Sequence, residues 1–341
     1  MEAKPNPSSK EAFENVMNAA REKAASAHHR LPHFYLRGFA GKNGRIDLLD
    51  PATGLRRSVA PRNAFAEVGY YTARDENLEQ VALMEVLFED FENHAARVHR
   101  FLVDGRSPAD LDVKARSYFS FLMAAQITRG ESFRDLDRDL AEGLGKQVLR
   151  VGAAHSDEWW DQFIAEMKAA GEEIPEVSRE QYVEFIERDE YTLQHSPEQR
   201  TELMLSPIRD LAEIFFRFGW QVVRFDQPCL VSSEEPISYW RPPSESLMFR
   251  GIGPATSDEV RLPLSPVVAL VLTHPELGFK DRVGYGGPRA AAWLNYSTWA
   301  HRPNQPLVIC PDIEHHPLPT PGELDGSPSL RTFTPGPIIN R

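Results

Sequence analysis

Apolar residues in the middle of the chain recur with the period of an α-helix. Between residues 81 and 98 they fall at positions 81, 84, 87, 88, 91, 95 and 98, which places them on one helix face. Asp104 and Gly105 follow, and glycine is common just after a helix end. The next stretch starts with Ser107 and Pro108, which suit the cap and the first position of a helix. This stretch continues to Gly130 and is more apolar, which predicts a buried central helix.

Helical patterns continue to Gly219, and extended patterns flank them on both sides. Further helices are predicted within residues 131–154, 157–171, 178–190 and 196–219. Before them, short apolar–polar alternation on both sides of a Pro-Ala-Thr-Gly sequence predicts a hairpin within residues 44–61. After Gly219, short β-type runs separated by Pro- and Gly-rich turns predict strands, with one helix near residues 287–301.

The order of these elements predicts the fold class. Strands come first, then many helices, then strands again, and the absence of regular alternation favours an α+β fold over a doubly wound sheet. We expect a large central helical block packed beside a mainly antiparallel sheet, which the N-terminal hairpin and the C-terminal strands form together. A helix within residues 1–25 precedes the predicted domain, and a proline-rich arm at residues 316–341 follows it. The domain covers residues 26–315 and is β-rich over 26–75, helical over 76–219 and β-rich over 220–315.

Composition narrows the class of protein. The formal net charge of −12 disfavours non-specific binding to nucleic acid, because the phosphate backbone repels an acidic chain. The two cysteines lie far apart in sequence, which fits a reducing compartment. The N-terminus lacks the apolar run of a signal peptide, and the longest apolar stretch is too short to cross a bilayer. We therefore expect a cytoplasmic protein without membrane contact, and the sequence leaves its oligomeric state open.

Five local patterns follow one another along the chain. They are HRLPHFYLRGF from His29; MEVLFEDFENHAA with Glu85 and Glu92; AAQITRGESFR with Gln126, Arg129 and Arg134; LVSSEEPIS with Ser233 and Glu234; and LPLSP at residues 262–266. In order and spacing they resemble the bacterial family called domain of unknown function 4238, over about residues 28–312. Glu234 stands where the family pattern has an aspartate. The resemblance implies a shared fold and does not imply a reaction.

The two glutamates are candidates for metal binding. Glu85 and Glu92 lie almost two helical turns apart, so both carboxylates point from nearly one face, about 10 Å apart along the axis. Each could meet a partner from a neighbouring helix, and together with His29 they make a candidate ligand set for a divalent metal. The alternative is a solvated acidic face, because other acidic residues lie nearby.

Gln126 and Arg129 are further candidates, and they lie about one turn apart on a helix that is otherwise apolar. A buried arginine needs a carboxylate partner, because an unpaired buried charge is very costly. Glu85 or Glu92 could supply a structural ion pair that joins two helices. Alternatively, Arg129 holds a phosphate or carboxylate of a substrate in a bidentate fork.

His29, Ser233 and Glu234 complete the candidates. Histidine can act as a general base or metal ligand near neutral pH, although it can equally seal the edge of a core. Ser233 and Glu234 come at the predicted end of a strand, where both site residues and turn caps are common. The sequence lacks a GxSxG elbow, which disfavours a serine hydrolase. It also lacks the P-loop lysine of nucleotide-binding motifs and the CxxC and HExxH signatures of metal sites.

Two hypotheses about function follow. In the first, the chain is a metal-assisted hydrolase of a phosphate ester, nucleotide or nucleic acid. Its catalytic residues would be His29, Glu92, Arg129 and Glu234, and its substrate-binding residues Gln126, Arg134 and Ser233. In the second, the same side chains form a buried structural network in a non-catalytic ligand-binding or protein-interaction module. One shared cleft that solvent can reach would favour the enzyme, and separate buried ion pairs would favour the module.

Overall fold

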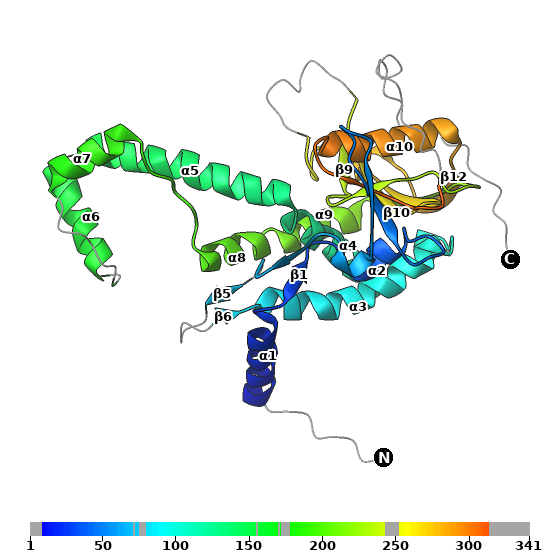
Figure 1. Ribbon diagram of the computed structural model, residues 1–341, viewed down its shortest axis with the longest axis horizontal. Helices are drawn as coiled ribbons and strands as arrows, with labels where there is room; N and C mark the ends of the chain where they lie inside the picture. Colours follow the sequence, from blue (N-terminus) through cyan, green and yellow to red (C-terminus); the bar gives the residue numbers. More distant parts are fainter. Residues whose placement is uncertain are drawn as a thin grey trace. The chain divides into compact units, whose positions relative to one another are not determined.

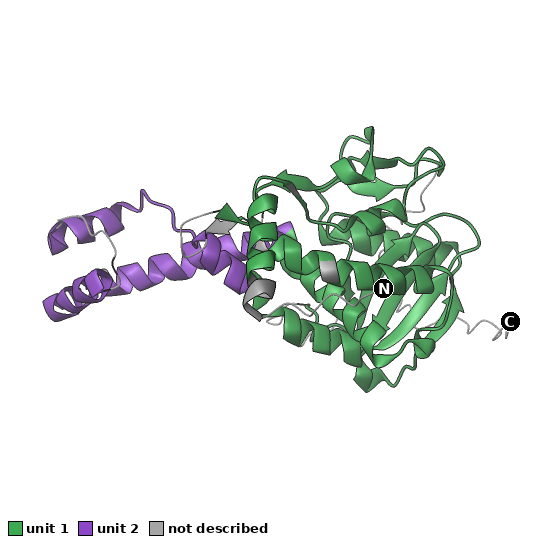
Figure 2. Ribbon diagram, turned by 90° about the horizontal axis from the view of Figure 1, so that it is seen from below, with its two compact units in different colours: residues 1–130, 204–341 green, residues 131–203 purple. Residues whose placement is uncertain are grey.

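Two compact units make up the chain. The computed structural model describes residues 9–70, 72–74, 80–154, 156–169, 171, 178–242 and 252–313. Unit 1 comprises residues 1–130 and 204–341, and unit 2 comprises residues 131–203 (Figure 2). Unit 2 is thus an insertion within the single domain predicted over residues 26–315. The predicted arm at residues 316–341 lies outside the described residues.

Helices supply much of both units. In unit 1 they are α1 (Ser9–Lys23), α2 (His33–Arg37), α3 (Leu83–Val103), α4 (Val113–Thr128), α9 (Ile208–Arg217) and α10 (Pro288–His301) (Figure 1). In unit 2 they are α5 (Glu131–Ala154), α6 (Asp157–Ala169) and α7 (Arg179–Arg188), and α8 (Pro197–Leu205) crosses the boundary. Among the described helices, none is both long and apolar enough to span a membrane.

Two main sheets lie in unit 1. The five-stranded sheet has the order β12 (Arg282–Tyr285), β7 (Gly219–Arg224), β11 (Val268–Thr273), β10 (Glu259–Ser265) and β9 (Ser238–Trp240). The four-stranded sheet has the order β3 (Arg56–Val59), β2 (Ile46–Leu49), β13 (Leu307–Ile309) and β8 (Ser232–Ser233). Two small pairs join β1 (Ala27–His29) to β4 (Ala66–Val68) and β5 (Ala73–Arg74) to β6 (Gln80–Val81).

These elements confirm the predicted α+β class. The predicted hairpin is β2 and β3, and β2 pairs antiparallel with β13 near the end of the described chain. The N-terminal hairpin and C-terminal strands therefore do share a sheet. Most of the other C-terminal strands form the separate five-stranded sheet, in which only the β12–β7 pairing is parallel.

The five-stranded sheet is covered on both faces, which explains its continuous apolar runs. Every residue of β10 and β11 is buried. On one face, Val223 and Val271 pack with Trp293 of α10 in one core cluster. On the other face, Trp220 meets Phe119 of α4 edge-on, at 5.8 Å between ring centroids. A strand with two buried faces needs apolar residues at successive positions, so alternation is lost. Figure 1 shows α10 and the α3–α4 block on opposite sides of this sheet.

Two predicted helix boundaries are wrong. Ser107 caps only a short 3₁₀ turn at Pro108–Asp110, and α4 begins separately after Asp112, whose side chain accepts a hydrogen bond from the Ala115 amide at 2.7 Å. The predicted helix at 196–219 is two helices, α8 and α9, and Pro207 precedes the second. Proline cannot donate the backbone hydrogen bond that a continuous helix requires there.

Candidate functional site

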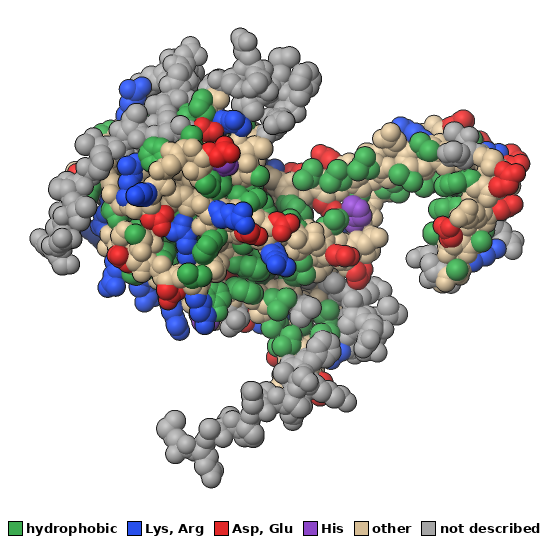
Figure 3. Space-filling model, turned by 180° about the vertical axis from the view of Figure 1, so that it is seen from behind, with side chains coloured by type: hydrophobic (Ala, Val, Ile, Leu, Met, Phe, Trp, Pro, Cys, Tyr) green, Lys and Arg blue, Asp and Glu red, His purple; other side chains and the backbone are tan. Residues whose placement is uncertain are grey.

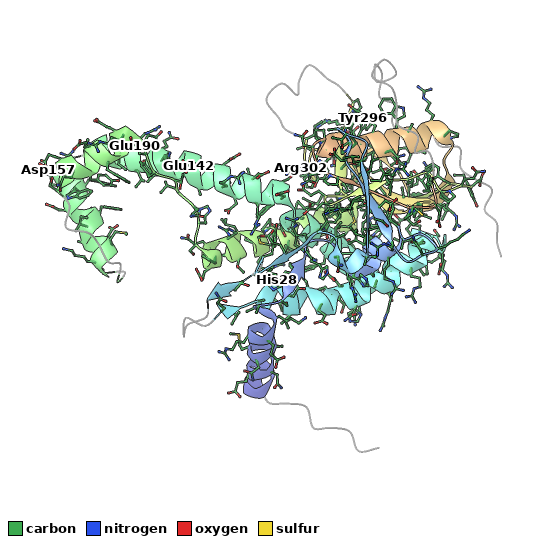
Figure 4. All side chains as sticks on the ribbon, viewed as in Figure 1. His28, Glu142, Asp157, Glu190, Tyr296 and Arg302 are labelled. Carbon is green, nitrogen blue, oxygen red and sulfur yellow. The ribbon has the colours of Figure 1, made fainter. Side chains whose placement is uncertain are left out.

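The segment from His28 to Pro32 joins β1 to α2 and passes between most of the predicted site residues. His28, labelled in Figure 4, lies on β1, and its Nε2 donates to the Lys23 carbonyl at 2.9 Å. The chain then reaches Pro32, which precedes the one-turn helix α2. Pro32 thus separates His29 from a helix that begins at His33. Proline suits the start of a helix because its fixed φ angle fits and its missing N–H is not needed there.

Arg129 and Glu92 form the first ion pair, in which Arg129 is buried and Glu92 is part-buried. Arg129 caps the C-terminus of α4 and is 1% exposed. Its Nη1 and Nη2 donate to Oε1 of Glu92 on α3 at 2.7 and 2.6 Å. Nη2 also approaches the His29 backbone carbonyl at 3.3 Å, and the guanidinium lies 4.3 Å from the centre of the Phe88 ring. The pair therefore ties α3, α4 and the His29 segment together.

Burial is the main influence on the pKa of Glu92. Removal from water raises the pKa of the Glu92 carboxyl above its usual value. The positive charge of Arg129 opposes this shift, and the nearby negative charge of Glu85 adds to it. Glu85 is half-buried on the same helix. Its negative charge makes it harder for Glu92 to lose its proton.

Arg30 and Glu234 form the second ion pair. The Arg30 Nε contacts the carboxylate of Glu234, which follows β8 and is 4% exposed. Arg30 also reaches Glu67 of β4 at 3.4 Å. The amide of Gln126 on α4 donates to the Arg30 carbonyl at 2.8 Å. The sequence patterns single out Glu234 and Gln126 but miss Arg30. A buried glutamate requires a cation, but Ser232, Ser233 and Glu235 around Glu234 are polar, so the local sequence does not signal that Glu234 is buried.

Hydrogen bonds connect the remaining patterns to the same segment. The Tyr35 hydroxyl of α2 donates to the Pro263 carbonyl of β10 at 2.6 Å, which leaves it to accept from the Ser232 hydroxyl at 2.7 Å. His99 of α3 donates from Nε2 to the Leu264 carbonyl at 2.8 Å. Elements that carry all five sequence patterns therefore meet in one network within unit 1, which we call the brace network. It consists of Arg30, Tyr35, Glu92, His99, Gln126, Arg129, Ser232 and Glu234, with their backbone partners.

His99 should make stability depend on pH. Burial is the main cause that lowers its pKa from 6.5 to about 4. The unfolded chain therefore binds the proton more tightly than the folded chain between these values. The contribution of His99 to stability is then largest above about pH 6.5 and falls by about 3 kcal/mol as the pH decreases to about 4. The check is the free energy of unfolding against pH for wild type and His99→Gln, which keeps a donor for Leu264. Parallel curves for the two proteins would contradict this expectation.

Other predicted site residues lie apart from the two ion pairs. The Ser233 hydroxyl donates to the Glu235 carbonyl at 2.9 Å, as in a local turn. The carboxylate of Glu235 lies 3.7 Å from His301 and 3.9 Å from Arg302 at the end of α10, where Figure 4 labels Arg302. Arg134 belongs to unit 2, where it lines a cavity of about 460 Å³ together with Asp137 and Arg200.

Two of the three predicted metal ligands, His29 and Glu92, are engaged with other partners. The His29 imidazole uses Nε2 to bond the Arg62 carbonyl at 2.8 Å, and the Glu92 carboxylate accepts from Arg129. Among the described residues, no group of three or more His, Cys, Asp or Glu side chains is placed to hold a metal ion. The metal site and its ligands stay a prediction.

A small apolar cavity borders the brace network. Leu31, Tyr35, Met123, Gln126 and Pro236 are among its lining residues, and its volume is about 20 Å³. This is enough for about one water molecule. Gln126 Oε1 is buried without a hydrogen-bond partner among the described residues, so it is the natural contact for such a water. The cavity is too small for a phosphate ester.

Comparison with known proteins supports the family resemblance. A family model described as "Protein of unknown function (DUF4238)" matches residues 27–296. No curated protein and no solved structure matches the chain. The matched range includes all five sequence patterns and the whole brace network. The chain therefore belongs to the DUF4238 family.

Proposed function

We propose that this protein is a non-catalytic protein-interaction module, in which unit 1 is a rigid scaffold and unit 2 carries the binding surface. The observation that carries the proposal is the pairing of the candidate catalytic residues. Glu92 and Arg129 form one largely buried ion pair, and Glu234 forms another with Arg30. The adjoining cavity of about 20 Å³ leaves no room for a substrate. These side chains hold the His29–Pro32 segment between the helices and the β8 loop, which is a structural role.

Unit 2 supplies a surface that suits a partner. We call Leu136, Leu140, Leu144, Val148 and Val151 the α5 ridge; these side chains are between 43% and 65% exposed. The other large exposed apolar side chains of the described chain are spread over several elements. Single exposed apolar residues are ordinary on protein surfaces, whereas several on one face mark an interaction site. Figure 3 shows hydrophobic side chains gathered along unit 2.

A hydrolysis assay tests the non-catalytic part. The full chain is incubated with bis(p-nitrophenyl) phosphate and with nucleotides, in the presence of magnesium, manganese or zinc. We expect no turnover above the buffer blank. Turnover that Glu92→Gln and Glu234→Gln abolish would overturn the proposal, provided their circular dichroism is unchanged. Glu89→Gln is the matched control, because Glu89 lies on α3 and is largely exposed.

A stability measurement tests the interaction surface. Leu140→Glu places a charge in the α5 ridge, where the side chain is already in contact with water. Surface substitutions of this kind usually change stability by about 0.5 kcal/mol or less. At a protein concentration at which the wild type is a monomer, we therefore expect the melting temperature to stay within a few degrees of wild type. A large drop would mean that the ridge belongs to the folded core of the chain, and the surface would then not be available to a partner.

A further inference from the structure

We propose, resting on the proposed function, that the partner of the α5 ridge is the α5 ridge of a second copy of this chain, bound antiparallel. Leu136, Leu140, Leu144 and Val148 follow one another at every fourth residue, which makes a continuous row along α5. Ridges of this kind pack into the grooves of a second helix, and a crossing angle of about 20° keeps two antiparallel helices in contact along their length. A symmetric pair uses the same surface on both chains, so one apolar row is sufficient for both sides.

A hollow at the C-terminal end of the ridge matches the ridge's own N-terminal end. A cavity of about 380 Å³ is lined by Trp159 of α6 and by Leu144, Gln147, Val148, Val151 and Gly152 of α5, so its lining is mainly apolar. An antiparallel crossing centred near Leu144 brings Leu136 and Leu140 of the second copy towards this hollow. Two leucine side chains suit its mainly apolar lining. The hollow and the side chains that fill it thus lie at opposite ends of one helix, as a two-fold symmetric pair requires.

Charge along α5 also favours the antiparallel direction. Residues 131–142 carry five acidic and two basic side chains, whereas residues 143–154 carry two basic side chains and no acidic ones. Asp139 and Arg150 lie about three turns apart and therefore on one flank of the ridge. In an antiparallel pair this flank faces its own symmetry mate, so Asp139 of each copy approaches Arg150 of the other. The Nη2 of Arg150 lies 3.1 Å from a carboxylate oxygen of Asp189. Because Arg150 is exposed, its guanidinium can also contact a carboxylate of the second copy.

Gly143 gives the two helices room to approach. It lies near the middle of α5 at the edge of the ridge, is exposed, and a Cβ atom there would have no neighbour within 4 Å. Glycine in the middle of a helix lowers stability by about 0.5–1 kcal/mol relative to alanine. A second helix that packs closely near the centre of the crossing would explain why glycine stands at this position.

Sedimentation velocity over a range of concentrations tests the pairing. We expect the full chain to change from the mass of one chain to that of two as its concentration rises. Leu140→Glu should weaken this association by about a hundredfold or more, since a charge would be buried without a partner. Leu55→Glu is the control, because Leu55 is 71% exposed in unit 1 and should leave association unchanged. Asp139→Arg and Arg150→Asp should each weaken it by several-fold, and the double variant should recover most of the loss.

A thiol cross-linker tests whether the two α5 helices pair antiparallel. Leu144→Cys lies near the proposed crossing and should cross-link to its own copy with a short bis-maleimide. Two Leu136→Cys positions would lie about 25 Å apart along the axis in an antiparallel pair and should not cross-link. The wild type controls for Cys229 and Cys310, of which the second is buried. Equal cross-linking at positions 136 and 144 would overturn the antiparallel arrangement.

A chain that remains a monomer at every concentration would overturn the inference as a whole. The α5 ridge would then be covered by another part of the same chain or by a different protein. That result would leave the non-catalytic proposal standing, because the hydrolysis assay judges it separately. Conversely, metal-dependent hydrolysis that requires Glu92 would remove the proposed function without changing the mass of the particle.

Discussion

Replacing Arg129 with methionine should lower the free energy of unfolding by about 2–3 kcal/mol, because the change leaves the part-buried carboxylate of Glu92 without its cation. Arg129 is 1% exposed, and both of its terminal nitrogens donate to Glu92. The change also removes the contact with the His29 carbonyl, so the segment before α2 loses one of its anchors. Urea unfolding, followed by circular dichroism, measures the loss.

A double variant separates the charge from the packing. Arg129→Met with Glu92→Leu removes both charges and should recover a large part of the stability, because apolar pairs often replace buried ion pairs without loss. Arg138→Met is the control, since Arg138 is exposed and pairs with Asp135 at the surface of α5. A loss of less than about 1 kcal/mol in Arg129→Met would show that the ion pair does not brace the fold.

Replacing Asn295 with alanine should cost about 2–5 kcal/mol, because two backbone groups would lose their partner at once. Asn295 of α10 is fully buried. Its Oδ1 accepts from the Val231 amide at 2.9 Å, and its Nδ2 donates to the Cys229 carbonyl at 2.9 Å. This side chain therefore takes the place of a neighbouring strand for the chain just before β8.

Thermal unfolding of Asn295→Ala and Asn295→Asp checks this assignment. Aspartate keeps the acceptor for Val231 but places a second oxygen against the Cys229 carbonyl, so it should also destabilise the protein. Arg289→Ala is the matched control, because Arg289 is exposed on the same helix. Equal melting temperatures for Asn295→Ala and Arg289→Ala would contradict the role of Asn295.

The sequence predicts elements well where one local signal dominates. The end of α3 at Asp104 and Gly105 is confirmed, and Gly105 has a φ of +82°, which glycine adopts without strain. The β2–β3 hairpin is likewise confirmed. The start of α4 is wrong because two capping signals compete: Ser107 and Asp112 both suit an N-cap, and both act as one.

Candidate site residues are predicted less completely, because their partners come from distant parts of the chain. Arg129 requires a carboxylate, and Glu92 is one of the two glutamates that the sequence offers. Arg30 gives no local signal, since a single arginine beside a histidine is also common on exposed surfaces. Only the contact with Glu234, far along the chain, reveals its role. The division into two units is also invisible locally, because residues 131–203 have the same helical pattern as the core helices.

Because α4 packs against α9, the fold of unit 1 can accept insertions of different lengths between these two helices. The chain leaves unit 1 at Gly130, after α4, and re-enters it at Met204, shortly before α9. The two helices on either side of this gap contact each other directly, so unit 1 closes without help from the residues between them. The entropy lost on closing such a gap rises only with the logarithm of its length. Insertions of very different sizes can therefore be exchanged at this point while the core keeps its fold.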